Sequence, residues 1–236
     1  MTAIFILFMQ MSFAQSYEYR AEIFDLNNPQ QKLFDLKLQE EQKENQLDIQ
    51  ARFLKDNVEQ LVEKAVITAD KAEIVRYEVN QLQTKEKGLI TVEGNQIKIE
   101  YTDSSGQKKN KTLNRPDQLV APANFEHWLE VNFKKIEAEK TMVIDFLVWD
   151  RLDLFKFKVS YLGLQDWKNQ KVHQFKMNLN NPFLATFISP IKMTFSQDMK
   201  KILLYEGRVA VKQGQGPDLK NLDGKVEYFH QLKASQ

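Results

Sequence analysis

The sequence predicts a mainly β protein, built as an antiparallel curved sheet, a barrel or a half-barrel of about 10–12 strands with one inserted amphipathic helix. Two observations support this fold class. Apolar and polar residues alternate with a period of two along most of the chain, as they do in strands that have one buried face. Glycine, asparagine, aspartate and proline interrupt this alternation at a spacing of roughly 8–12 residues, which is typical of turns in all-β domains. We therefore expect residues 15–236 to form a single β-rich domain.

The first half of the chain contains the regular alternation. Strands are predicted at 17–23, 34–38 and 47–53, and the polar run at 40–45 is interpreted as a solvated connection between two of them. Residues 58–68 fit both a helical stripe and a strand. A short strand over the second half of this segment is favoured because a β-rich run follows at 73–82. Further short strands, separated by turns at Gly88, Gly94 and Gly106, then complete a meander.

Residues 122–136 are predicted to form the helix. Pro122 suits the first turn, where its missing N–H costs nothing. The apolar side chains that follow fall on one stripe: Phe125, Trp128, Leu129, Phe133 and Ile136. Such a stripe must cover an apolar surface, so we expect the helix to pack across the sheet or close one end of a barrel.

Residues 141–163 are expected to form the central hairpin of the sheet. The run 142–149 is apolar on both faces apart from Asp145, as in a strand that is covered on both sides. The polar residues 150–153 reverse the chain, and 155–161 alternate cleanly. Later strands are predicted at 172–179, 191–196, 201–212 and 225–232, with a helical turn at 183–189 and an exposed loop at 214–224.

Composition excludes several classes of function. The chain carries 33 basic and 32 acidic side chains, so it lacks the basic excess of a general nucleic-acid binder. It has no cysteine, which excludes disulfides, thiol chemistry and thiolate metal sites. We expect no cofactor and no metal.

The first fourteen residues are predicted to be a secretory leader. They form a short apolar run that ends in Ser12, Phe13 and Ala14, a small-x-small cleavage pattern. The run is too short to cross a membrane, and no later segment is apolar and long enough to do so. The sequence thus predicts a soluble periplasmic or secreted protein, cleaved near Ala14 and without a transmembrane segment.

Several short motifs occur in order in the second half. They are FEHW at 125–128, DFLV at 145–148 with RLDL at 151–154, NPFL at 181–184, LLYEG at 203–207 and DGK at 223–225. In this order, over about residues 122–228, they resemble a family of uncharacterised periplasmic proteins of Gram-negative bacteria, which share a domain of unknown function. The resemblance implies a β-rich extracytoplasmic fold with no established activity, and it assigns no functional residues.

No catalytic motif is present, since the chain lacks a nucleophile elbow and a histidine pair at metal-ligand spacing. His173 and His230 each lie on an apolar strand face and could meet inside a barrel, or each could be satisfied separately by a carbonyl or a hydroxyl. Asp145, as the only charge in its strand, requires a partner. Arg151 and Arg208 are the candidates for an ion pair, and a carboxylate facing a ligand is the alternative.

Two functions remain open. The first is a non-enzymatic binder of a lipid or another hydrophobic ligand in the cell envelope. Its candidate ligand-binding residues are Phe125, Trp128, Phe157, Tyr161, Phe175, His173, His230 and Asp145. The alternative is an envelope hydrolase or isomerase that uses buried histidine and Asp145. A histidine bonded to Asp145 in an open cleft would favour the enzyme. The sequence does not determine the oligomeric state.

Overall fold

The structure is a computed structural model, and it describes residues 15–181 and 189–230. These residues form 15 strands of one sheet and one α-helix. The predicted leader and nearly all of the predicted helical turn at 183–189 lie outside the described residues. The prediction of a mainly β fold with one inserted helix is confirmed, with more strands than expected.

The first half of the chain forms β1 (Gln15–Asp25), β2 (Asn28–Lys43), β3 (Gln46–Lys55), β4 (Val58–Thr68), β5 (Ile74–Gln81), β6 (Glu86–Glu93), β7 (Gln96–Thr102), β8 (Lys108–Asn114) and β9 (Leu119–Val120). The short turn η1 (Pro122–Asn124) leads into α1 (Phe125–Glu139). The second half forms β10 (Thr141–Val148), η2 (Trp149–Arg151), β11 (Asp153–Trp167), β12 (Gln170–Leu179), β13 (Ile191–Ser196), β14 (Ile202–Gln213), η4 (Gly216–Asp218) and β15 (Lys220–Phe229).

The two halves of the chain join in the middle of the sheet. Strands β1 to β8 follow one another outward from the middle on one side, and β15 back to β9 follow on the other. The join is the antiparallel pair β1–β15, in which Ile23 lies opposite Val226. The short edge strand β9 pairs in parallel with β10, and the other neighbouring strands pair antiparallel. The sheet is open, with β8 and β9 at its two edges.

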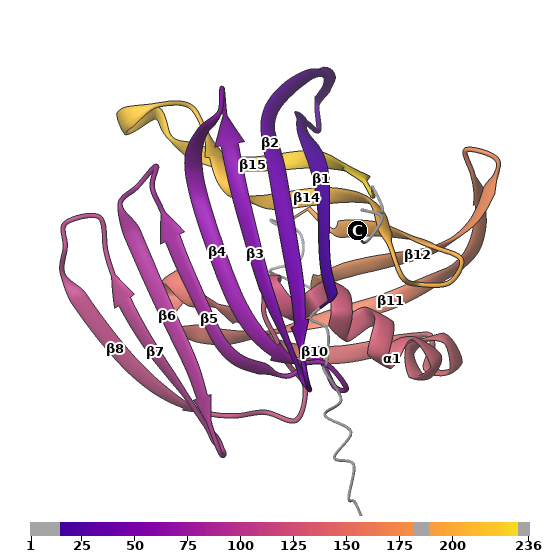
Figure 1. The fold of residues 1–236 in the computed structure, drawn as a ribbon, viewed down its shortest axis with the longest axis horizontal. Coiled ribbons are helices and arrows are strands. Elements are labelled where there is room, and N and C mark those ends of the chain that lie inside the picture. Colours follow the sequence, from indigo (N-terminus) through magenta and orange to yellow (C-terminus); the bar gives the residue numbers. More distant parts are fainter. Residues whose placement is uncertain (1–14, 182–188, 231–236) are drawn as a thin grey trace, which may run out of the picture.

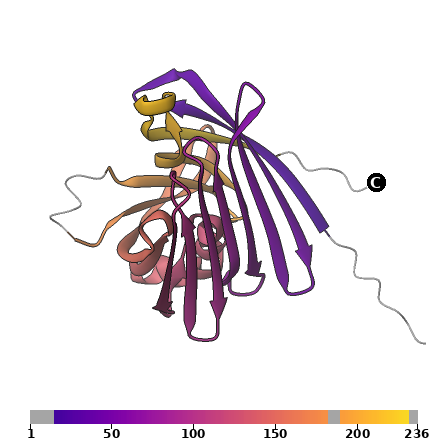
Figure 2. The ribbon, with the colours of Figure 1, turned by 90° about the vertical axis from the view of Figure 1, so that its left-hand side faces the viewer.

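The open sheet folds over on itself. In Figure 1, β3 to β8 stand nearly upright at the front, alternating in direction, while β11, β12 and β14 run across them behind. Figure 2 shows the two layers from the side, with α1 between them at one end. The inner faces of the layers form the core, where Tyr77 from the front and Phe175 and Phe195 from the back are fully buried. Such packing buries alternate residues of most strands, whereas the edge strand β8 has no buried residue.

The predicted helix at 122–136 is confirmed, and in the structure it spans Phe125–Glu139. Pro122 begins the preceding turn, and Lys140 ends the helix in the left-handed conformation, with a φ of 64°. Phe125, Trp128 and Leu129 are buried against the sheet. The helix therefore packs on the sheet with most of its apolar stripe covered and its opposite face exposed.

Three predictions about the strands need correction. Residues 58–68 are one 11-residue strand, β4, with no helical part. Strand β2 continues to Lys43, so residues 40–43 of the polar run belong to a strand and not to a connection. Strand β15 begins at Lys220, inside the predicted loop at 214–224. In the last two cases, cross-strand pairing extends a strand through polar residues that the alternation alone assigns to a connection or a loop.

The hairpin formed by β10, η2 and β11 exists as predicted, but it is not central. Strand β10 lies beside the edge strand β9, and Val143 is 43% exposed. Its outer face is therefore uncovered around Val143 but covered at Leu147, and the prediction of a strand buried on both sides over its whole length is wrong. Single exposed apolar side chains are common on protein surfaces, so the apolar run did not require a second layer.

Candidate functional site

Six titratable side chains meet where α1 approaches the middle of the sheet, at one end of the space between the layers. We call them the mouth cluster: Tyr19 of β1, Glu40 of β2, Glu126 and His127 of α1, and Tyr228 and His230 at the end of β15. The cluster thus brings together side chains from four elements in three separate regions of the sequence.

The Tyr19 hydroxyl lies at the centre of the cluster. It donates a hydrogen bond of 2.9 Å to Oε1 of Glu40 and lies 3.5 Å from Oε2 of Glu126. Nε2 of His127 is 3.1 Å from the same Glu40 oxygen. Helix α1 is therefore bound to β1 and β2 by polar contacts in addition to its apolar stripe.

The peptide groups of Ile202, the first residue of β14, are also bound by the cluster. Oε1 of Glu126 accepts the N–H of Ile202 at 3.3 Å, and Nε2 of His230 donates to its carbonyl oxygen at 2.5 Å. The His230 ring stacks on Tyr19 with a centroid distance of 4.7 Å. The start of β14 is thus attached to the helix on one side and to β15 on the other.

The protonation properties of the cluster follow from its burial and its charges. Burial raises the pKa of Glu126 to about 7, and the negative charge of Glu40 adds to this shift. Burial opposes a charged His127, yet the hydrogen bond and charge of Glu40 raise its pKa to about 8. The pKa of Glu40 is lowered because the contacts with His127 and Tyr19 outweigh its burial. The two carboxyl groups therefore titrate in different pH ranges.

Local sequence explains how these side chains come to face inward. Tyr19 shares the inner face of β1 with the buried Ala21 and Ile23. Glu40 continues the inner face of Leu36 and Leu38 on β2, and its side chain is only 11% exposed. Sequence reasoning missed the cluster because it interpreted 40–45 as a connection. The continued alternation from residue 34 to residue 40 is the signal that could have identified Glu40.

An open hollow of about 630 Å³ lies beside the mouth cluster. Its lining residues are Gln170, Ser196, Gln197, Asp198, Lys201, Leu203, Tyr228 and His230. The hollow thus combines one apolar and aromatic part with a polar rim that carries both signs of charge. The volume falls in the range of small-molecule sites.

Lys201 supplies an ammonium group to this rim. Among the described residues, no carboxylate forms an ion pair with its ammonium within 4.0 Å. Burial lowers the pKa of His230, and the nearby Lys201 ammonium lowers it further. The neighbouring Lys200 differs, because its ammonium is paired with Glu130 of α1. Asp198, also on the rim, accepts hydrogen bonds through Oδ1 from the Ser196 hydroxyl and the Lys200 N–H.

The candidate residues from the sequence lie in three separate places. Tyr161, His173 and Phe175 pack together against Phe133 of α1, with the His173 ring 4.5 Å from that of Phe133. His173 donates from Nε2 to the carbonyl of Gln197 at 3.1 Å, so its Nδ1 accepts from the Tyr161 hydroxyl at 2.8 Å. Each inward-facing histidine is thus hydrogen-bonded to a different backbone carbonyl, as one of the two alternatives predicted.

The remaining candidates are structural neighbours of α1 and β10. Phe125 stacks near Trp128, and Phe157 packs edge-on against Phe146 at 5.4 Å. Asp145 forms an ion pair of 2.9 Å with Lys156, its cross-strand neighbour. The predicted partners of Asp145 are therefore wrong.

Of those two predicted partners, Arg208 binds Asp223 instead, at 2.7 Å. An antiparallel pair places side chains on one face directly opposite each other, and sequence alone did not provide the register that sets Lys156 against Asp145.

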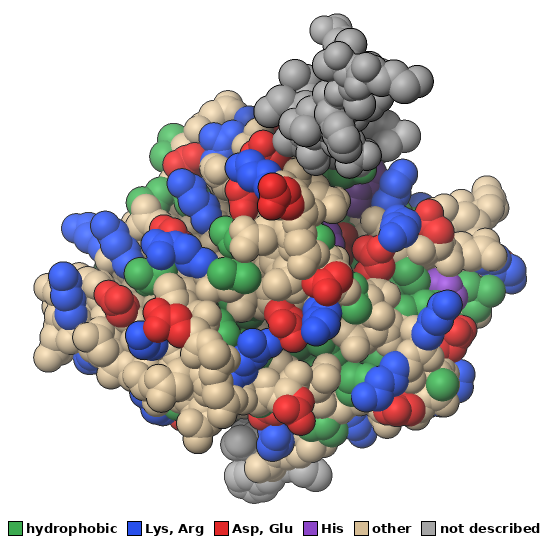
Figure 3. Space-filling view, turned by 60° about the horizontal axis from the view of Figure 1, so that its bottom comes forward, with side chains coloured by type: hydrophobic (Ala, Val, Ile, Leu, Met, Phe, Trp, Pro, Cys, Tyr) green, Lys and Arg blue, Asp and Glu red, His purple; other side chains and the backbone are tan. Residues whose placement is uncertain are grey.

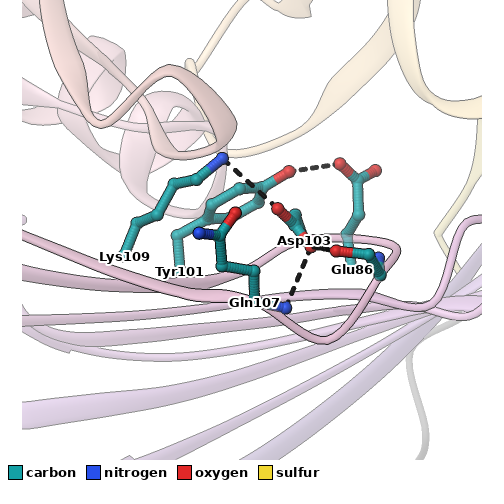
Figure 4. Close-up of polar contacts among 6 residues, drawn as sticks. Glu86, Tyr101, Asp103, Gln107 and Lys109 are labelled. Carbon is teal, nitrogen blue, oxygen red and sulfur yellow. Dashed lines mark hydrogen bonds and ion pairs between the residues drawn. The ribbon is translucent and has the colours of Figure 1, made fainter.

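A second polar group lies at the far end of the front layer (Figure 4). Tyr101 donates to Glu86, and Asp103 accepts from the N–H groups of Ser105 and Gln107 and forms an ion pair with Lys109. These contacts lower the pKa of Asp103 to about 2, with the Ser105 hydroxyl as the main cause. Bonds of this pattern stabilise the turn between β7 and β8, so we assign the group a structural role.

Figure 3 shows acidic and basic side chains interspersed on the face that it presents, without a continuous basic area. Among the described residues, no three histidine, aspartate or glutamate side chains are grouped so as to hold a metal ion. Within the same residues, no helix has the length and apolar character needed to cross a bilayer.

Comparison with known proteins does not assign the chain to a family. No family model matches it, and no curated protein matches it in sequence.

Proposed function

We propose that this protein is a non-enzymatic extracytoplasmic binding protein whose ligand is a small amphipathic molecule with an anionic head group. The hollow beside the mouth cluster is its binding site. The extracytoplasmic location rests on the predicted leader at 1–14 and on the resemblance of residues 122–228 to periplasmic proteins.

The observation that supports this proposal most strongly is that Lys201 lines the same hollow as apolar and aromatic side chains. Leu203 and the rings of Tyr228 and His230 line the same hollow as the ammonium of Lys201. An ammonium without a carboxylate partner favours an anion, and rings and a leucine favour the apolar part of the same molecule. Fatty acids and related lipids with an anionic head have both features.

The inner residues proposed from the sequence do not support binding in the centre of the fold. Phe175 is fully buried and contacts the rings of Phe133, Tyr161 and Phe195. Trp128 is 3% exposed and donates a hydrogen bond to Gln118. Because these side chains already pack against one another, we place the ligand at the mouth instead.

The enzymatic alternative has less support. Glu40 and Glu126 titrate in different pH ranges, as an acid and a base would. However, the Tyr19 hydroxyl contacts both carboxyl groups and occupies the position that a reacting atom would need. His173 and His230 each donate to a backbone carbonyl, and the carboxylate of Asp145 is bound to Lys156.

Titration with a fluorescent fatty acid and with the corresponding fatty alcohol tests the proposal. We expect saturable binding of the acid, and we expect Lys201→Met to weaken it at least tenfold, since a charge-assisted hydrogen bond contributes about 1.5–3 kcal/mol. The same substitution should leave binding of the alcohol nearly unchanged.

Lys200→Met is the matched control, because it removes an adjacent ammonium that is already paired with Glu130. It should leave the affinity for the acid within about twofold of the native value. Absence of saturable binding by the native protein, or equal effects of the two substitutions, would refute the proposal.

A further inference from the structure

The rim segment at residues 201–203 is attached to the mouth cluster through the peptide groups of Ile202. Ile202 lies between Lys201 and Leu203, which both line the hollow. Its N–H is bound by Glu126 and its carbonyl by His230. A change in the position of either side chain would therefore move the segment that carries the ammonium and part of the apolar wall.

We propose that the mouth cluster is a proton-controlled latch, which holds α1 and the rim at residues 201–203 together at low pH and loosens them as the pH rises. The latch itself is a property of the fold. Only its effect on the ligand rests on the proposed function.

The geometry makes the latch sensitive to two protons. When Glu126 is protonated and His127 is charged, the single negative charge on Glu40 faces one positive charge and the Tyr19 hydroxyl. When both protons are lost, the carboxylates of Glu40 and Glu126 face the same hydroxyl, which can donate to only one of them. Like charges at short range in a largely buried site repel strongly.

The direction of the effect follows from the pKa values. Folding raises the pKa of Glu126 from 4.5 to about 7 and that of His127 from 6.5 to about 8. A raised pKa means that the closed state holds the proton more tightly than the open state. The stabilisation is therefore complete at low pH, and it is lost from about pH 4.5 to 7 for Glu126 and from about pH 6.5 to 8 for His127.

Other charged groups around the cluster do not reverse this trend above pH 7. Tyr19 and Tyr228 stay protonated, because burial raises the pKa of each well above its ordinary value. The pKa of His230 is lowered, so the fold favours its neutral form. The stabilisation that this form provides is lost only when the pH becomes acidic. Glu130 and Lys200 form an ion pair at the edge of the cluster. Lys201 adds a positive charge near His230.

Hydrogen exchange of α1 without any ligand tests the latch. We expect the amides of residues 125–133 in the native protein to exchange at least about tenfold faster at pH 8.5 than at pH 6, after correction for the intrinsic rate. Glu126→Gln should clearly reduce this difference, because the amide cannot lose a proton, and the part that comes from His127 should remain. Glu130→Gln, one turn further along α1, should retain it.

The possible outcomes separate the latch from the proposed function. An equal pH dependence in native protein and Glu126→Gln refutes the latch, even if the fatty acid binds. If Glu126→Gln does not fold, Glu40→Gln removes the other carboxylate and should likewise reduce the pH dependence. A full pH dependence in Glu40→Gln would also refute the latch.

Fatty-acid affinity provides the second measurement. In the native protein it should fall between pH 6 and 8.5, and in Glu126→Gln it should fall clearly less. A constant affinity in the native protein despite faster exchange would refute the coupling of the latch to the hollow. If the native protein binds no fatty acid at all, the exchange experiment still decides whether the latch exists.

Discussion

Glu63 is an acidic side chain in the core of the front layer, and a single hydroxyl satisfies it. It is 7% exposed, and its Oε1 accepts a hydrogen bond of 2.8 Å from the Tyr77 hydroxyl. Burial raises the pKa of Glu63 to about 7. At neutral pH the pair therefore holds a carboxyl group that is partly protonated, in a place where a lone charge would be costly.

Removing the hydroxyl of Tyr77 should reveal that cost. Tyr77→Phe keeps the ring volume but leaves the Glu63 carboxyl without its partner, so we expect the free energy of unfolding to fall by about 1–3 kcal/mol. Urea unfolding at pH 7 measures this change. Tyr17→Phe is the control, because Tyr17 is 39% exposed and its hydroxyl can bond to water. An effect of Tyr77→Phe no larger than that of the control would show that the buried hydrogen bond does not stabilise the fold.

At the scale of the element, alternation predicts the face of a side chain well and its depth poorly. Phe157 lies on the inner face of β11, as its spacing indicates, but it is only half-buried. Trp128 lies on the apolar stripe of α1, which the sequence also predicts, and it is almost fully buried. How deeply a side chain is buried depends on the side chains that lie opposite it in the other layer. The local sequence pattern does not contain that information.

This difference in depth predicts an order of stabilities. Trp128→Ala should lower the free energy of unfolding by about 3–5 kcal/mol, since it removes a fully packed ring and the hydrogen bond to Gln118. Phe157→Ala should cost clearly less, because water already reaches part of the ring. Lys158→Ala, on the exposed face of the same strand, should change stability by less than about 0.5 kcal/mol. A larger loss for Phe157→Ala than for Trp128→Ala would mean that α1 is not part of the core.

For the whole molecule, the sequence predicted the fold class, the helix and most strands, but not the mouth cluster. Tyr19, His127 and His230 come from three regions of the chain, and they meet because β1 pairs with β15 and α1 lies between the layers. Alternation predicts neither strand order nor register. It did mark His230 as inward-facing, which is the part of the cluster that a local pattern can reveal.

The predicted cleavage site at Ala14 directly precedes Gln15, the first residue of the described part of the chain. We expect the full chain, expressed in a Gram-negative host, to yield periplasmic protein whose N-terminus is Gln15 or Ser16 by intact-mass measurement. Ala14→Arg should block processing, because cleavage requires a small side chain at that position. Periplasmic native protein that keeps Met1, or normal processing of Ala14→Arg, would show that residues 1–14 are not a cleaved leader.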